Sequence, residues 1–219
     1  MDKIKKFPLP IFNYISALTI FLTEQMILLI WLNDPGNVIK AILVSVVLSI
    51  LAITIVVRLR NNAPKVKIWK RIRDGLAFAA LLGFSTIALI FVFKALGLTV
   101  GTSQNSARIV SYLSHNLVTK IVMFIYIVFQ APIIEELCFR YLMNPATLTN
   151  KVKIGSAILS TTLFAYAHIS TNTDNVYSML SYFLISTFLI LAFLRGYDIK
   201  QNMINHSFWN LFTILITFL

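Results

Sequence analysis

Long apolar runs are the feature that most constrains this chain. Windows of roughly 20 residues, the length that a helix needs to cross the hydrocarbon core of a bilayer, occur at 8–32, 38–57, 75–97, 117–143, 154–170, 176–194 and 203–219. Hydrophobic residues make up 58% of the chain and charged residues only 12%, which excludes an ordinary soluble domain. The runs also lack the alternation of barrel strands. The sequence therefore predicts an all-α, polytopic transmembrane bundle of about seven spans.

The lysine and arginine residues predict how this bundle is oriented. With the N-terminus inside, three of them precede the first span, seven lie between 58 and 73, three between 140 and 153, and two between 195 and 200. That distribution puts 15 of the 19 on the cytoplasmic side. We therefore attribute the net charge of +11 to topology and not to nucleic-acid binding. The mixed polarity of residues 106–120 suits an eighth, re-entrant or interfacial helix at the outer surface.

Neither an internal repeat nor a long linker divides the chain. We expect one transmembrane domain over residues 1–219, with apolar N-terminal spans in 1–116 and the polar motifs in 117–219. The single cysteine, Cys138, has no second cysteine in the chain to pair with, so an internal disulfide and a cysteine-based metal site are excluded. Any chemistry is therefore expected from the second half.

The stretch APIIEELCFRYLM, residues 131–143, places two glutamates and an arginine inside an apolar segment. A charge at the bilayer centre costs roughly 2.5 to 3.5 kcal/mol, so such groups usually face the bundle interior and have partners. Glu136 and Arg140 are four residues apart and can pair on one helical face. Glu135 points about 100° away on a regular helix, so Arg140 cannot serve both acids equally. Glu135 is therefore the candidate general base.

Two further motifs place polar groups on later helices. Phe164 and His168 share one face of the fifth span, and His206 and Asn210 lie four residues apart on the last. Each has a plain structural interpretation: a lone histidine on an apolar helix is more often a satisfied core residue, and histidine and asparagine commonly link membrane helices. The three motifs together favour a site.

E-E-x-x-x-R, F-x-x-x-H and H-x-x-x-N, in this order over residues 131–210, resemble the three motifs of the CPBP intramembrane proteases. That family includes the CAAX prenyl endopeptidases and the bacterial Abi or bacteriocin-immunity proteins. Tyr141 stands where the family most often has glycine, which bears on local backbone geometry but removes no reactive group.

The resemblance implies an intramembrane endopeptidase. Glu135 would act with His168 to activate a water molecule against a peptide carbonyl. His206 and Asn210 would donate hydrogen bonds to the developing oxyanion. The supporting residues would be Glu136, Arg140 and Phe164.

The resemblance leaves cofactor and substrate open. We assign no metal and favour a metal-free site, because HExxH is absent. If zinc is bound, Glu135, His168 and His206 form the His₂Glu ligand set. The expected partners are membrane lipid and a peptide or membrane-protein substrate, with no nucleic acid. Small size and a Lys-, Ile- and Asn-rich composition resemble a bacterial, plasma-membrane member with a cytoplasmic N-terminus.

Two other classes of function use the same polar groups. A non-catalytic immunity or scaffold protein would use them only to link helices, and it would tolerate Glu135→Gln where an enzyme would not. A proton-coupled transporter would use them as a relay, but the chain lacks paired halves and helices broken by Gly or Pro at matching positions.

The protease interpretation makes a geometric prediction. A water-filled cavity open to the cytoplasmic side should hold Glu135, His168, His206 and Asn210. Counted at about 1.5 Å per residue, these side chains lie at different depths, so the helices must tilt for them to meet. A separation of more than about 10 Å between His168 and Glu135 would remove the mechanism, because the two groups would be beyond reach of a shared water.

Overall fold

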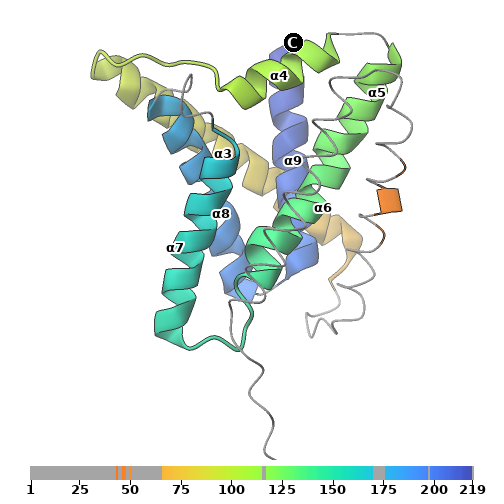
Figure 1. Ribbon diagram of the computed structural model, residues 1–219, viewed down its shortest axis with the longest axis vertical. Coiled ribbons are helices and arrows are strands. Elements are labelled where there is room, and N and C mark those ends of the chain that lie inside the picture. The colour runs from red at the N-terminus through yellow and green to blue at the C-terminus, as the bar shows by residue number, and fades with distance from the viewer. Residues whose placement is uncertain are drawn as a thin grey trace, which may run out of the picture.

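The computed structural model describes residues 66–114, 117–169, 176–196 and 198–218, together with Leu43, Val46, Val47 and Ile50. Within this part of the chain every regular element is a helix, as the all-α prediction requires (Figure 1). The predicted span 8–32 lies outside the described residues, as does 38–57 apart from those four positions.

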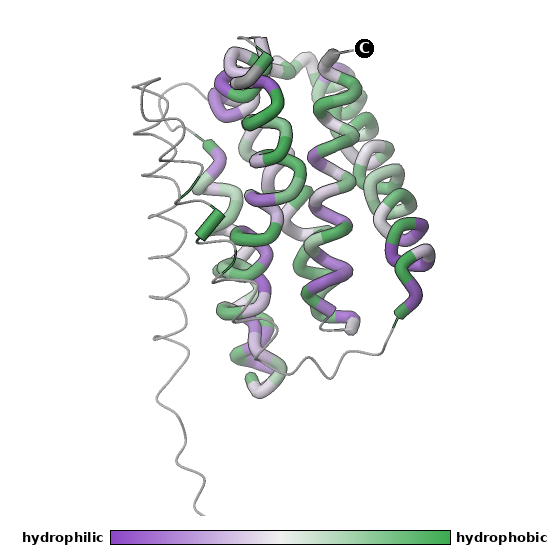
Figure 2. The backbone as a smooth tube through the Cα atoms, turned by 90° about the vertical axis from the view of Figure 1, so that its right-hand side faces the viewer, coloured by the Kyte–Doolittle hydropathy of each residue, from purple (hydrophilic) through white to green (hydrophobic). Residues whose placement is uncertain are grey.

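The described helices follow one another through a single bundle. They are α3 (Ile68–Ala95), α4 (Gln104–Leu113), α5 (Leu117–Ile125), η2 (Tyr126–Gln130), α6 (Ala131–Glu135), η3 (Glu136–Leu142), α7 (Asn150–Ala167), α8 (Val176–Gly196) and α9 (Ile199–Phe218). The four elements from α5 to η3 follow without a break, and η2 and η3 are π-helical. Along the backbone of these helices, hydrophobic residues predominate and hydrophilic residues are interspersed among them (Figure 2).

Three of the described helices are long and apolar enough to cross a membrane: Ile68–Ala95, Thr119–Leu142 and Val176–Gly196. They overlap the predicted spans 75–97, 117–143 and 176–194. The predicted spans at 154–170 and 203–219 are indeed helical, as α7 and α9, but these two helices do not meet the same criterion. Both carry runs of polar side chains, so the predicted total of seven or eight spans is not confirmed.

The predicted short helix in 106–120 is present as α4. The preceding helix ends in a Schellman motif, in which Gly97 takes a positive φ of 68° and the Leu98 amide donates to the Phe93 carbonyl at 2.9 Å. Ser103 then caps α4 by accepting a hydrogen bond from the Ser106 amide at 3.0 Å. These two signals turn the chain so that α4 lies across the same end of the bundle as the C-terminal end of α9 (Figure 1).

Two glycines allow α3 to approach α9 closely. A Cβ on Gly75 would lie 2.6 Å from Cδ2 of Phe208, and one on Gly83 would lie 2.9 Å from Cε1 of Phe212. Small residues at such positions are how membrane helices pack without a hydrophobic driving force between them. This contact fixes α9, which carries the third motif.

A buried apolar cluster holds the first and second motifs together. Its members, from α6, η3 and the residue after it, α7 and α8, are Ile134, Cys138, Phe139, Met143, Phe164 and Leu189. The rings of Phe139 and Phe164 meet edge to face with centroids 5.4 Å apart. The polar residues described next therefore project from helices that are packed against each other.

Candidate active site

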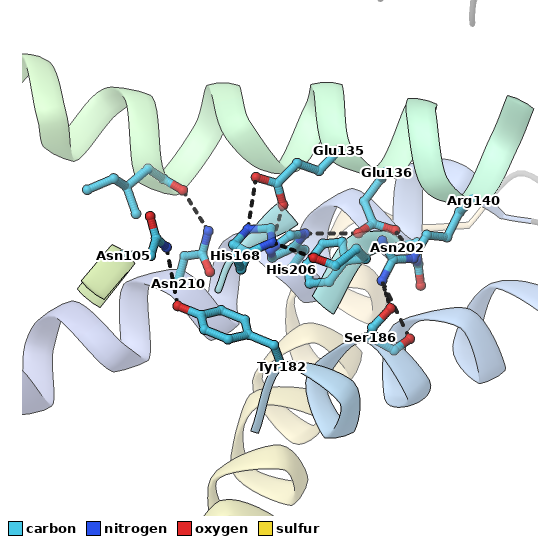
Figure 3. Close-up of polar contacts among 12 residues, drawn as sticks. Asn105, Glu135, Glu136, Arg140, His168, Tyr182, Ser186, Asn202, His206 and Asn210 are labelled. Atoms are coloured by element: carbon cyan, nitrogen blue, oxygen red, sulfur yellow. Dashed lines mark hydrogen bonds and ion pairs between the residues drawn. The ribbon is translucent and has the colours of Figure 1, made fainter. Parts of the chain in front are cut away.

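Glu135 and Glu136 are both buried, with 5% and 0% of their surface exposed. A regular helix would direct these neighbours about 100° apart, and only one could face a given partner. Here Glu135 ends α6 and Glu136 begins the π-helical η3. The wider π turn changes the direction of the side chains that follow, a feature often found at functional sites. Both carboxyl groups consequently face α9 (Figure 3).

His168 lies at the C-terminal end of α7, one residue past the helix. Its Nδ1 is 2.8 Å from the carbonyl oxygen of Phe164, and its Nε2 is 3.5 Å from Oε1 of Glu135. The separation is far inside the limit of about 10 Å that the mechanism sets. The expected approach of His168 to Glu135 is therefore confirmed.

His206, on α9, bridges the two glutamates. Its Nδ1 is 2.9 Å from Oε1 of Glu136, and its Nε2 is 3.7 Å from Oε2 of Glu135. Separations of 3.5 and 3.7 Å are longer than direct hydrogen bonds, and among the described residues Oε2 of Glu135 has no hydrogen-bond partner. Glu135 therefore faces two imidazoles without being bonded tightly to either.

The partners of Nδ1 decide which ring nitrogens carry hydrogen. A carbonyl oxygen and a carboxylate accept hydrogen bonds, so Nδ1 of His168 and of His206 must each carry the proton. In the neutral form both Nε2 atoms then present lone pairs toward Glu135. His168 Nε2 is thus set up to accept a proton, whereas His206 Nε2 can donate only when that ring carries two protons.

A second layer of polar groups surrounds Glu136. Asn202, one turn before His206 on α9, donates from its amide to Oε2 of Glu136. Arg140 approaches the same oxygen, with Nε at 3.5 Å. The predicted Glu136–Arg140 pair is therefore present, but His206 and Asn202 are the closer partners of Glu136.

Arg140 itself is completely buried. Its guanidinium lies 4.4 Å above the centre of the Phe164 ring, and Nη2 donates to Oγ of Ser186 at 3.1 Å. The cation is thus held by a carboxylate, an aromatic face and a hydroxyl from α8. Through Arg140, Phe164 and α8 therefore help to hold Glu136 in place.

Asn210 lies on the same face of α9 as His206, and its amide donates to the carbonyl oxygen of Ile127 at 2.8 Å. That bond uses one of two amide hydrogens. The carbonyl belongs to η2, where the π turn interrupts the regular helical bonding. Asn210 is therefore oriented by backbone while one N–H remains for another acceptor.

One cavity of about 490 Å³ contains all four predicted site residues, Glu135, His168, His206 and Asn210. Glu135 and His206 are buried lining residues, whereas Thr102, just before α4, and Arg108, on α4, are exposed lining residues. The polar groups therefore meet in a single space, as the geometric prediction requires.

The exposed lining of this cavity lies at the end formed by α4 and the last turns of α9, including Thr217. The orientation predicted from the charges makes that end the outer one, so the predicted cytoplasmic opening is not confirmed. The site lies toward the α4 end because His168 is at the C-terminal end of α7.

Glu135, His168 and His206 carry the donor atoms that a zinc ion would need. Both histidines have Nδ1 held by an acceptor and Nε2 turned to Glu135, the pattern that also orients zinc ligands. Among the described residues, however, no group of three or more His, Cys, Asp or Glu side chains has the geometry of a metal site. The donor types suit zinc while the geometry does not, so no step is assigned to a metal.

Three supporting residues were missed by the sequence analysis. Asn202 is detectable, because it lies four residues before His206 and eight before Asn210 on one face of α9. Ser186, which binds Arg140, and Tyr182, whose ring centroid lies 4.9 Å from that of His168, have no comparable signal, since a hydroxyl on an apolar helix is common. Their roles depend on which helix α8 packs against.

Comparison with protein families points to the same part of the chain. The model of the type II CAAX prenyl endopeptidase Rce1-like family matches residues 117–212, which contain all three motifs. The match confirms the resemblance to the CPBP intramembrane proteases that the motifs predicted. No curated protein and no solved structure was found to match the chain.

Proposed function

We propose that this protein is an intramembrane endopeptidase in which Glu135 and His168 activate a water molecule to hydrolyse a peptide bond. The observation that supports it best is the meeting of the Glu135 carboxylate with two imidazole Nε2 atoms inside a single cavity: Oε1 lies 3.5 Å from Nε2 of His168, and Oε2 lies 3.7 Å from Nε2 of His206. Structural linkage of helices would favour short, satisfied hydrogen bonds, and Oε2 of Glu135 has none among the described residues.

In the proposed first step, water loses a proton to Glu135 while its oxygen forms a bond to the carbonyl carbon. The carbonyl π electrons move to oxygen and give a tetrahedral oxyanion. His168 Nε2 lies beside the same carboxylate and holds the attacking water by accepting its second hydrogen. In the second step the carbon–nitrogen bond breaks, and Glu135 returns the proton to the leaving amine.

The oxyanion needs donors on the opposite side of the reacting carbon. Asn210 supplies its second amide N–H, and His206 supplies Nε2–H when both of its nitrogens are protonated. Donors fixed in advance in a water-poor site typically contribute about 10²- to 10³-fold to kcat. Asn202 and Arg140 hold Glu136, which in turn fixes the ring of His206.

We further propose that the substrate is a peptide or the end of a membrane-associated protein that enters from the α4 end of the bundle. The cavity wall combines hydroxyl and amide groups with aromatic rings, which suits an extended peptide backbone. A bacterial plasma-membrane location and a role in bacteriocin maturation or immunity follow from the family analogy and belong to the same proposal. So does a cytoplasmic N-terminus, which the distribution of lysine and arginine supports.

The test compares cleavage of a panel of quenched fluorescent peptides by the wild type, Glu135→Gln and Asp74→Asn in detergent. Asp74 is a carboxylate paired with Lys70 at 2.8 Å on α3, away from the cavity, so it controls for loss of an acid. The proposal predicts that Glu135→Gln loses activity while Asp74→Asn retains it. Equal cleavage by the wild type and Glu135→Gln would show that the base is wrongly assigned.

A further inference from the structure

The imidazole of His168 lies between two aromatic rings. The ring centroid of Phe164 is 4.4 Å away on one side and that of Tyr182 is 4.9 Å away on the other, each inclined by 28° to the imidazole. Phe164 is part of the second motif and of the buried apolar cluster. Tyr182 comes from α8 and belongs to none of the three motifs.

Because His168 lies at the end of its helix, the stacked rings are needed to hold its imidazole in place. His168 is the C-cap of α7, so no further helical turn follows it. The Nδ1 contact with the Phe164 carbonyl restrains one edge of the ring. Rotation of the imidazole about that contact would carry Nε2 away from Glu135, and the two aromatic faces oppose such a rotation.

Tyr182 is itself held through its hydroxyl. Asn105 donates to this oxygen from Nδ2 at 3.2 Å, and Oγ of Ser103 and of Ser106 lie 3.1 and 3.5 Å from it. All three residues belong to the capped start of α4, where Ser103 is also the N-cap. Figure 3 shows the tyrosine hydroxyl directed to Asn105 while its ring lies near His168.

We propose that Tyr182 is a positioning residue of this site. Its ring holds the His168 imidazole against Phe164 with Nε2 aimed at Glu135, and its hydroxyl ties that ring to the start of α4 beside the cavity. The role in catalysis rests on the proposed peptidase function, whereas the stacking does not. Tyr182 and His168 both line the cavity, so the aromatic ring also excludes water from one face of the imidazole.

Two substitutions separate the ring from the hydroxyl. Tyr182→Phe keeps the aromatic face and loses the bonds to α4, while Tyr182→Leu loses both. Phe188→Leu is the matched control, because Phe188 is on the same helix, makes an edge-on contact with Phe78 at 6.4 Å and does not line the cavity. Thermal unfolding of each variant in detergent establishes that the compared proteins are folded.

Steady-state kinetics give the first readout. A displacement of about 1 Å in a reacting group can cost about 100-fold, so Tyr182→Leu should lower kcat by about 10- to 100-fold with little change in KM. Tyr182→Phe should restore most of kcat, and Phe188→Leu should match the wild type. An unchanged kcat in Tyr182→Leu, or a loss confined to KM, would overturn the positioning role.

The histidine ring C–H resonances in NMR give a readout that needs no cleavage. Protons above an aromatic face resonate at higher field, so Tyr182→Leu should move the His168 signals to lower field and Tyr182→Phe should leave them nearly in place. His168→Gln identifies the signals. Unchanged resonances in Tyr182→Leu overturn the positioning role even in an active enzyme. Shifted resonances in a protein that cleaves nothing would instead show that the peptidase proposal has failed, and the catalytic role with it.

Discussion

Replacing Glu136 with glutamine should destabilise the protein far more than replacing an exposed acid in a similar pair. Glu136 is fully buried and meets three groups, which are the amide of Asn202, Nδ1 of His206 at 2.9 Å and Nε of Arg140 at 3.5 Å. Glutamine keeps one oxygen but places an NH₂ group where the second oxygen accepted a bond. A buried donor then faces another donor.

The size of the effect follows from these contacts. Removing one member of a buried ion pair typically costs about 3 to 5 kcal/mol, because the remaining charge stays in a low dielectric without its partner. Nε and Nη1 of Arg140 already lack hydrogen-bond partners among the described residues, so the arginine depends on the carboxylate for its charge balance. We therefore expect Glu136→Gln to lower the free energy of unfolding by about 3 to 5 kcal/mol.

Unfolding in mixed micelles with increasing SDS measures this difference. Asp74→Asn is the matched control, since Lys70–Asp74 is also an i,i+4 pair but is exposed, and it should unfold like the wild type. Adding Arg140→Met to Glu136→Gln should recover part of the loss, because it removes the unpaired charge. Surface ion pairs contribute less than about 1 kcal/mol, and a cost in that range for Glu136→Gln would show that the buried Arg140 does not depend on the Glu136 carboxylate.

Three other outcomes are expected. Gly75→Ala should lower the free energy of unfolding by about 1 to 3 kcal/mol by overpacking against Phe208, while Gly155→Ala, with no atom within 4 Å of the added Cβ, should not; equal effects would contradict the α3–α9 contact. Asn210→Ala should lower kcat by about 10²- to 10³-fold through loss of an oxyanion donor, and an unchanged kcat would exclude that role. Prolonged treatment with a strong chelator should leave cleavage unchanged, whereas loss that zinc restores would establish a metal enzyme.

The sequence predicted which polar groups would meet, whereas the predicted number of membrane spans is not confirmed. Carboxylate and imidazole groups are costly in an apolar helix, so Glu135, His168 and His206 stood out without any structure, and the cavity contains all three. The segments 154–170 and 203–219 were counted as spans because they are apolar over most of their length, although the polar faces of α7 and α9 lie in the bundle interior. Hydropathy alone does not separate a helix that crosses lipid from one that is shielded by its neighbours.

Two features of the site lay beyond sequence reasoning for a physical reason. The π-helical turns after Ile125 and Glu135 arise from tertiary packing, and no residue pattern predicted that Glu135 and Glu136 would both face α9. The contact of Tyr182 with His168 depends on how α8 packs beside α7. Local periodicity contains neither kind of information.

In the proposed mechanism Glu135 and His168 act on the same water molecule as one unit. The most direct test is a comparison of kcat/KM for Glu135→Gln, His168→Gln and the double variant, all shown to be folded. When two groups act as a unit, the effects of substituting them on kcat/KM are strongly non-additive. The double variant should therefore be no slower than the slower single variant. A double variant whose loss equals the product of the two single losses would show that the residues act independently and would contradict the mechanism.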